Sequence, residues 1–366
     1  MALTAGIVGL PNVGKSTLFN AITNAQVEAA NYPCATIDPN VGGVEVPDYR
    51  LEKLTELIKP KKTVPTTFGF TDIAGLVKGA SRGEGLGNKF LGNIRETDAI
   101  CEVVRCFRDK DVTHVDGDVD PIRDIETINL ELIFADLETV ERRIGRLGKK
   151  AQSGDKDAKI EIAILEKLKA TLEANKPARI IDFSKEEMAI VKQYTLLTMK
   201  PIIYVANLGE EDLEDPNSNP HYVKVVEFAT NEGADVVPIC AKIESELVGM
   251  DKAEKDMFLQ ELGIEESGLD KLIKEAYKLL GLRTYFTAGV QEVRAWTFKE
   301  GMTAPEMAGI IHSDFQRGFI KAETYSFEDL VEYGSEHALK EAGKIRQEGK
   351  QYVGQDGDIM LFKFNV

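Results

Sequence analysis

The sequence predicts an α/β fold, with a doubly wound parallel sheet, an inserted antiparallel pair of helices and a smaller α+β domain at the C-terminus. Three observations support this fold class. Short apolar strands alternate with helical segments, a heptad pattern separates two of the strands, and the residue pattern changes again from about Leu282. The chain has 366 residues, which is enough for two or three domains.

The strands expected in the parallel sheet are short and mostly apolar, because helices cover both faces of such a sheet. The expected strands are Leu3–Val8, Val44–Val46, Thr66–Thr71, Ile100–Cys106, Ile202–Ala206 and Val236–Cys240.

A long helical segment separates the fourth of these strands from the fifth. Its apolar residues recur at alternating spacings of 3 and 4, which is typical of a coiled-coil seam. The turn-forming residues Ser153-Gly154-Asp155 then precede a second helix, so we expect an antiparallel hairpin that projects from the sheet. A solvated strut and a partner-docking arm fit this pattern equally well. The seam residues are Leu130, Ile133, Leu137, Val140, Ile144 and Leu147.

The C-terminal segment predicts a small mixed domain. Thr303-Ala304-Pro305-Glu306 has the form of a capping box with proline in the first turn, and it predicts the start of an amphipathic helix. The turn residues 355–358 precede the apolar run Ile359–Phe362, which predicts a terminal hairpin that begins near Tyr352.

The formal net charge of −16 argues against a surface that binds polyanions in general, because nucleic-acid affinity depends on Lys and Arg side chains that neutralise phosphates. We therefore expect no sequence-specific DNA binding, and any RNA partner must meet a local basic patch. The sequence has no run of about 18 apolar residues, so no contact with a membrane is expected. The N-terminus lacks the features of a signal peptide, which favours a cytoplasmic location.

The four cysteines form no CxxC pair and have no histidine at the spacing of a zinc site. Cys101, Cys106 and Cys240 lie in apolar strand-like runs, which indicates buried free thiols in a reducing compartment. Cys34 lies instead in a loop-like segment, where we interpret it as a candidate for redox sensitivity.

The segment from Gly9 to Thr17 carries the strongest chemical signature in the chain. It matches the P-loop pattern G-x-x-x-x-G-K-[ST], follows the first strand and leads into a helical segment. The backbone amides of such a loop wrap the phosphates of a nucleotide, and the helix N-terminus adds its dipole. Lys15 is expected to reach the β- and γ-phosphates and to act in catalysis. The predicted phosphate-binding residues are Asn12, Val13, Gly14, Lys15, Ser16 and Thr17.

This motif identifies the doubly wound sheet as a P-loop NTPase domain. The expected boundaries are residues 1–125 and 199–281 for the nucleotide-binding domain, 126–198 for the helical coiled-coil insertion and 282–366 for the C-terminal domain.

Three residues are candidate ligands of Mg²⁺. The hydroxyl of Ser16 can bind the ion directly, and Asp72, at the end of a strand, can hold it through water. Thr36 lies in a candidate first switch and would complete the coordination when a γ-phosphate is present. Gly75 can donate its amide to the same phosphate. The glycine-dense segment 75–87 fits a second switch, although a plain flexible loop predicts the same composition.

The base of the nucleotide is expected to meet Asn207-Leu208-Gly209-Glu210, which follows a strand. GTPases normally present Asn-Lys-x-Asp here, and the aspartate accepts two hydrogen bonds from guanine. Glu210 is one methylene longer than aspartate and cannot make that contact without backbone movement, so discrimination for guanine is lost. Leu208 offers an apolar contact to a purine, which favours ATP over GTP. Ala241-Lys242 fits the loop that completes this pocket.

Hydrolysis is expected to be slow. Leu76 occupies the position after Gly75, where many regulatory GTPases keep a glutamine that orients the attacking water. Asn12 is a residue type that can help to bind a monovalent cation such as K⁺ beside the phosphates. His114 could swing towards the γ-phosphate, whereas a lone loop histidine is usually only solvated.

The residues leave four functions open. A slow, switch-like ATPase that docks on a large partner is favoured by the glycine-dense switch segments, the two accessory domains and the missing glutamine. A GTPase translation factor would use the same motifs with the opposite base preference. A metabolic kinase would need an acceptor pocket and an arginine-rich lid, and a nucleotide-gated binding protein would have negligible catalysis.

On these motifs the chain resembles the Obg-like ATPase family, in its bacterial YchF branch, over essentially its whole length. The C-terminal region resembles a TGS domain, which is a ubiquitin-like β-grasp module. The segments that carry the resemblance are Gly9–Thr17, Asp72–Ala80, Asn207–Glu210, the helical insertion and Leu282–Asn365.

The resemblance implies a monomeric ATPase that hydrolyses GTP less well than ATP. It implies Mg²⁺ bound by Ser16 and Thr36, and adenine contacted through Leu208. It also assigns the catalytic role to His114 and implies association with ribosomes through the large subunit.

Overall fold

The computed structural model describes residues 3–24, 41–73, 86–109, 112 and 118–365. It divides into two compact units. The first comprises Met1–Val44 and Gly69–Leu272, and the second comprises Glu45–Phe68 and Ile273–Val366. The second unit therefore includes a stretch from the N-terminal part of the chain that the sequence places in the nucleotide-binding domain.

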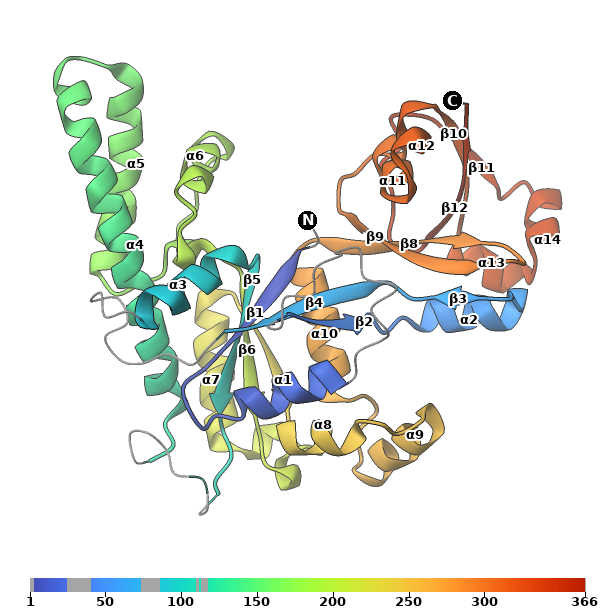
Figure 1. The fold of residues 1–366 in the computed structure, drawn as a ribbon, viewed down its shortest axis with the longest axis horizontal. Helices are drawn as coiled ribbons and strands as arrows, with labels where there is room; N and C mark the ends of the chain where they lie inside the picture. Colours follow the sequence, from blue (N-terminus) through green and yellow to red (C-terminus); the bar gives the residue numbers. More distant parts are fainter. Residues whose placement is uncertain (1–2, 25–40, 74–85, 110–111, 113–117, 366) are drawn as a thin grey trace. The chain divides into compact units, whose positions relative to one another are not determined.

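The first unit is built on a six-stranded sheet with the order β2-β4-β1-β5-β6-β7 (Figure 1). β1 pairs in parallel with β4 and β5, and β6 pairs in parallel with β5 and β7. The predicted parallel sheet is thus confirmed. The strands are β1 (Thr4–Val8), β2 (Val41–Glu45), β4 (Thr67–Asp72), β5 (Ala99–Arg105), β6 (Ile202–Asn207) and β7 (Asp235–Ile239).

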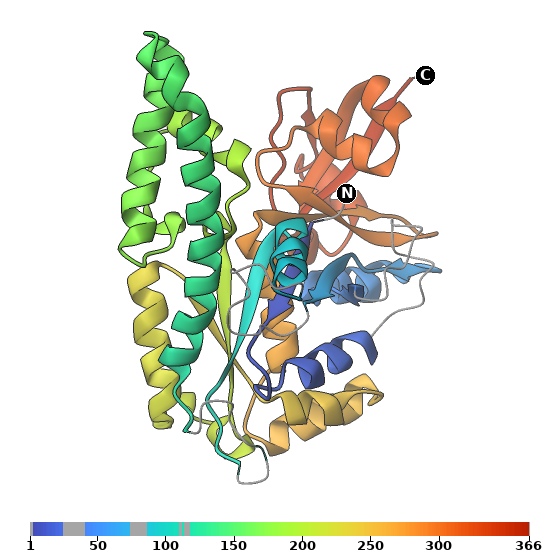
Figure 2. The ribbon, with the colours of Figure 1, turned by 60° about the vertical axis from the view of Figure 1, so that its left-hand side comes forward.

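Helices cover both faces of this sheet. α1 and α8 pack together on one face, and α4 and α7 pack together on the other (Figures 1 and 2). Both faces of β5 and β6 are consequently buried, which explains their continuous apolar character. The helices are α1 (Lys15–Asn24), α3 (Leu86–Glu96), α4 (Pro121–Gln152), α5 (Lys156–Glu173), α6 (Lys185–Val191), α7 (Pro220–Glu232), α8 (Ala241–Leu247), α9 (Lys252–Glu261) and α10 (Gly268–Leu279), the last of which continues into the second unit.

α4 and α5 form the predicted antiparallel hairpin, whose far end extends away from the sheet (Figure 2). The side chain of Asp120 caps α4, and that of Asp155 caps α5. Gly154 lies between the two helices with a φ of 96°, a conformation that favours glycine. The heptad positions Val140 and Leu147 are buried in the hairpin core, as the sequence predicts.

The second unit contains a six-stranded sheet with the order β11-β10-β12-β8-β9-β3. The capping box at Thr303 is present and begins α11, as predicted. The strands are β3 (Thr63–Val64), β8 (Leu282–Ala288), β9 (Val293–Lys299), β10 (Phe319–Ser326), β11 (Arg346–Glu348) and β12 (Asp358–Phe364), and the helices are α2 (Tyr49–Ile58), α11 (Ala304–Ile311), α12 (Ser313–Arg317), α13 (Phe327–Tyr333) and α14 (Glu336–Glu341).

The predicted terminal hairpin is wrong. β12 lies inside the sheet, antiparallel to β10 and parallel to β8, and Val353 forms only an isolated bridge with Thr303. The physical reason is that β12 is apolar on both faces. Met360 packs in the core beside α11, and Ile359 packs in the core beside α2 and α13. A strand whose two faces are both buried in hydrophobic cores is expected in the interior of a sheet, between two neighbouring strands.

The segment 45–68 completes the second unit. β3 pairs in parallel with β9, with Thr63 opposite Val293. α2 inserts Leu51 and Leu54 into the same core as Phe286. This small domain therefore depends on residues that precede β8 by more than two hundred positions in the sequence.

Candidate functional site

The P-loop connects the end of β1 to the start of α1. Gly14 has a φ of 96° and Asn12 a φ of 64°, so the backbone reverses within three residues. The carbonyl of Gly14 accepts the first helical hydrogen bond, from the amide of Leu18 at 3.0 Å. α1 thus begins at Lys15, with the free amides of its N-terminus at the loop.

Lys15 and Asp72 are brought together by the pairing of β1 with β4. The lysine Nζ lies 2.5 Å from the Asp72 Oδ1, and Lys15 is only 8% exposed. Asp72 is the last residue of β4, and Ile7 of β1 stands opposite it in the sheet. Register between two buried strands therefore places the carboxylate beside the P-loop lysine, 57 residues away in the sequence.

Asn207, at the end of β6, links the P-loop to the loop after β7. Its Nδ2 donates to the carbonyl of Val13 at 2.8 Å, and its Oδ1 accepts from the amide of Ala241 at 3.0 Å. Asn207 is buried, and so are both of its partners. The sequence predicts Asn207 as a base contact, whereas the structure gives its side chain a bridging role. Ala241 carried only a weak sequence signal, and this bond makes it part of the site.

Replacing Asn207 by alanine should lower the affinity for nucleotide about tenfold. The change leaves the Val13 carbonyl and the Ala241 amide buried without a partner, which costs about 1–3 kcal/mol. Calorimetric titration with Mg-ATP measures the effect. Asn129→Ala is the matched control, because Asn129 is equally buried but bonds Arg179 instead. An Asn207 variant that binds ATP as tightly as the wild type would contradict the bridging role.

The loop after β6 differs in part from expectation. Leu208 is 2% exposed, so its side chain offers almost no surface to a purine in this conformation. Its amide is held by the Ile239 carbonyl at 2.8 Å. Glu210 begins a short 3-10 helix, Glu210–Asp212, and its carboxylate lies 3.6 Å from the Lys242 Nζ. The two loops predicted to meet the base are therefore joined through exposed charged side chains.

Ser16 and Thr17 follow Lys15 in α1, and both are exposed, whereas Val13 is buried. Ser16 and Asp72 are hard oxygen donors of the type that Mg²⁺ prefers. In the part of the chain that the structure describes, there is no cluster of three His, Cys, Asp or Glu side chains that could hold a metal alone. A magnesium ion here would thus rely on hydroxyl, water and phosphate oxygens, which fits this donor set.

Three predicted site residues, Thr36, Gly75 and His114, lie outside the described residues, as does Cys34. The other three cysteines are free and buried, as predicted. Burial raises the pKa of the Cys101 and Cys106 thiols to about 12, so neither is a reactive thiolate.

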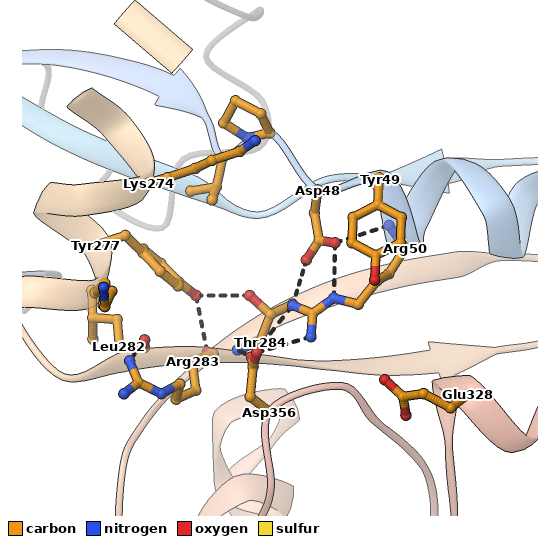
Figure 3. Close-up of a pocket in the computed structure, with 13 residues that line it drawn as sticks. Asp48, Tyr49, Arg50, Lys274, Tyr277, Leu282, Arg283, Thr284, Glu328 and Asp356 are labelled. Carbon is orange, nitrogen blue, oxygen red and sulfur yellow. Dashed lines mark hydrogen bonds and ion pairs between the residues drawn. The ribbon is translucent and has the colours of Figure 1, made fainter. Parts of the chain in front are cut away.

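The second unit contains a cavity of about 510 Å³ (Figure 3). Its charged groups largely satisfy one another. Arg50 binds Asp48 at 2.8 Å and Asp356 at 2.9 Å, and the hydroxyl of Tyr277 donates to the carbonyl of Arg283 at 2.9 Å. Since these contacts join α2 to the 355–358 turn and α10 to β8, we interpret this constellation as structural. The P-loop remains the candidate active site.

A parallel sheet with a P-loop, a buried lysine and an adjacent aspartate defines a P-loop nucleoside triphosphatase. The family described as "50S ribosome-binding GTPase" matches residues 4–136, and the YchF-GTPase C-terminal family, described as a protein of unknown function, matches residues 282–365. The chain belongs to the YchF family.

Full-length relatives support this assignment. Two similar proteins are named "Ribosome-binding ATPase YchF", from Bacillus subtilis at 66% identity and from Escherichia coli O157:H7 at 57%, each with 100% of both chains covered. The solved structure of the Schizosaccharomyces pombe YchF GTPase is similar at 42% identity with a TM-score of 0.89, covering 99% of this chain and 97% of that one. None of the helices in the described ranges is long and apolar enough to cross a membrane.

Proposed function

We propose that this protein binds ATP with Mg²⁺, hydrolyses it slowly to ADP and phosphate, and uses the two nucleotide states as a conformational switch on ribosomes. GTP is a poorer substrate. The observation that carries the proposal is the contact of Lys15 with Asp72 at the start of α1, in a chain whose base-recognition loop ends in Glu210.

The phosphates lie against the amides of residues 12–17, with the Lys15 amine on the β- and γ-phosphates and the amide of Gly75 on the γ-phosphate. Bound Mg²⁺ supplies charge neutralisation at the β- and γ-oxygens. Ser16, Thr36 and Asp72 hold that ion, directly or through water. His114 is the group that assists attack by water, and Asn12 helps to hold K⁺.

The base preference rests on Glu210. Its carboxylate is drawn towards Lys242 at 3.6 Å rather than standing free to accept the two hydrogen bonds of guanine. Asn207 and Leu208 complete the pocket, the latter through its main chain, because its side chain is buried. The relatives from Bacillus subtilis and Escherichia coli are named as ATPases, which supports the same preference here.

Association with ribosomes follows from the names of those relatives, and the description of the N-terminal family favours the 50S subunit. We also propose that the protein is cytoplasmic and monomeric, as the resemblance to the family implies. The acidic surface as a whole does not favour RNA, so the contact must be local.

Titration of the full chain with fluorescent ATP and GTP analogues in the presence of Mg²⁺ tests this function. We expect tighter binding of the ATP analogue, by about tenfold or more, because guanine loses its bidentate partner. Lys15→Ala, which removes the phosphate-binding amine, provides the baseline. Tighter binding of the GTP analogue would overturn the role given to Glu210.

A further inference from the structure

The segment Lys59-Pro60-Lys61-Lys62, which we call the lysine turn, joins α2 to β3 in the second unit (Figure 1). All three lysines are exposed. Within the described residues, none of their amines forms an ion pair or a hydrogen bond, in contrast to Lys53, which pairs with Glu56 at 2.9 Å. The lysine turn therefore presents three positive charges that no described residue pairs, on a chain of net charge −16.

The backbone of the lysine turn is held firmly. The amide of Lys61 donates to the carbonyl of Val290 at 3.1 Å, and the carbonyl of Lys62 accepts from the amide of Val293 at 3.0 Å. The hydroxyls of Thr55 and Thr63 lie 3.0 Å apart and close the base of the turn. The positions of the three Cα atoms are thus fixed by the β8–β9 connection, and only the side chains must be ordered when a partner binds.

Acidic groups are few around the turn, and Glu56, three residues before Lys59, already pairs with Lys53 at 2.9 Å. Residues 57–71 contain no Asp or Glu. Across the β3–β9 pairing, the carboxylate of Glu292 is bound in bidentate fashion by Arg294, at 3.0 and 3.1 Å. Since Glu292 is already occupied, the local excess of positive charge persists.

Lys59 occupies a position that favours glycine. It is the C-cap of α2 with a φ of 50°, in the left-handed region. Gly233 and Gly334 fill the equivalent left-handed positions of α7 and α13. A side chain there costs about 1 kcal/mol relative to glycine. Glycine would thus be more stable than lysine at this backbone conformation. The presence of a strained lysine indicates a role for the Lys59 side chain.

We propose that the lysine turn binds the phosphate backbone of RNA when the protein associates with ribosomes. Lysine amines are compact point charges that suit single phosphate oxygens, and a phosphate contact carries no sequence information. The lysine turn carries no aromatic side chain on which a base could stack. This inference rests on the proposed association with ribosomes, and it identifies the part of the protein surface that contacts ribosomal RNA.

The test uses the full chain with Lys59, Lys61 and Lys62 all changed to glutamine. Binding is measured to purified ribosomes by co-sedimentation, and to protein-free ribosomal RNA by fluorescence anisotropy over a range of salt concentrations. Loss of three phosphate contacts should reduce the slope of log K against log salt by about 2–3. Hydrolysis of ATP should not change.

The matched control changes Lys149, Lys150 and Lys156, three exposed lysines at the far end of the helical hairpin, to glutamine. It removes the same charge from a different surface. The proposal is supported if the turn variant loses affinity for both targets and the control keeps its affinity for RNA. It is overturned if the turn variant binds RNA like the wild type, or if the control loses RNA affinity equally. Lost ribosome binding with unchanged RNA binding would mean that the turn meets a protein.

Lys59→Gly separates function from stability. It relieves the left-handed strain, so we expect equal or greater resistance to denaturation together with weaker RNA binding. Unchanged RNA affinity in this variant would remove Lys59 from the contact. If the wild type fails to sediment with ribosomes but binds RNA through the turn, the proposed association fails while the assignment of the surface stands.

Discussion

Replacing Gly14 by alanine is expected to lower the affinity for nucleotide by about 100-fold or more. A Cβ on Gly14 would lie 2.1 Å from the Nδ2 of Asn207, so the Asn207 side chain must move and lose its bond to Val13. Gly14 also has a φ of 96°, where an L-residue is strained by about 1–2 kcal/mol. Together with the lost buried hydrogen bond, the cost is about 3 kcal/mol, which corresponds to about 100-fold in affinity.

A matched control separates backbone strain from the contact with Asn207. Gly154, at the turn of the helical hairpin, also has a φ of 96°, but apart from its two chain neighbours no described residue has an atom within 4 Å of a Cβ placed there. Gly154→Ala should therefore lower thermal stability slightly and leave ATP binding unchanged. Calorimetry with Mg-ATP measures both variants. If the Gly14 variant and the wild type bind ATP with equal affinity, the prediction is wrong. The Asn207 side chain would then move to make room for the new methyl group at no cost in affinity.

Some parts of the nucleotide site can be predicted from the sequence, and others cannot. The P-loop pattern, its flanking strand and helix, and Asp72 at a strand end were all visible as local signals. The bridging hydrogen bonds of Asn207 have no such local signal, because its partners Val13 and Ala241 are 194 and 34 residues away in the sequence. Local patterns predict which residues begin a helix or end a strand, whereas bridges between loops depend on how strands are ordered in the sheet.

The same limit applies to the fold. The heptad pattern predicts the α4–α5 hairpin well, since its two helices bury each other's apolar residues. The sequence predicts the wrong partner for the C-terminal strand, because a hairpin partner next to it in sequence is the commonest arrangement, whereas β12 pairs with β10 and β8. No local signal in the sequence predicts that β3 joins that sheet or that α2 packs against it. This arrangement depends on long-range pairing with β9 and on one arginine in particular.

Replacing Arg50 by methionine is expected to destabilise the second unit by roughly 3 kcal/mol. The Arg50 guanidinium binds both oxygens of Asp48 and both oxygens of Asp356, 306 residues away in the sequence (Figure 3). It also lies 5.4 Å from the ring centroid of Phe286. Asp48 is only 9% exposed. Methionine keeps much of the apolar packing but leaves that carboxylate almost buried and without its cation.

The chain's single tryptophan, Trp296 in β9, allows this effect to be measured in the second unit alone. Urea denaturation followed by tryptophan fluorescence should show a lower midpoint for Arg50→Met. Arg283→Met is the matched control, because its partner Glu300 is 66% exposed and such a surface pair contributes less than about 1 kcal/mol. ATP binding by the Arg50 variant should persist, since the P-loop belongs to the other unit. An unchanged midpoint would mean that the hydrophobic contacts of α2 with β8 and β9 suffice to hold this segment in place, and that the arginine bridge adds little to them.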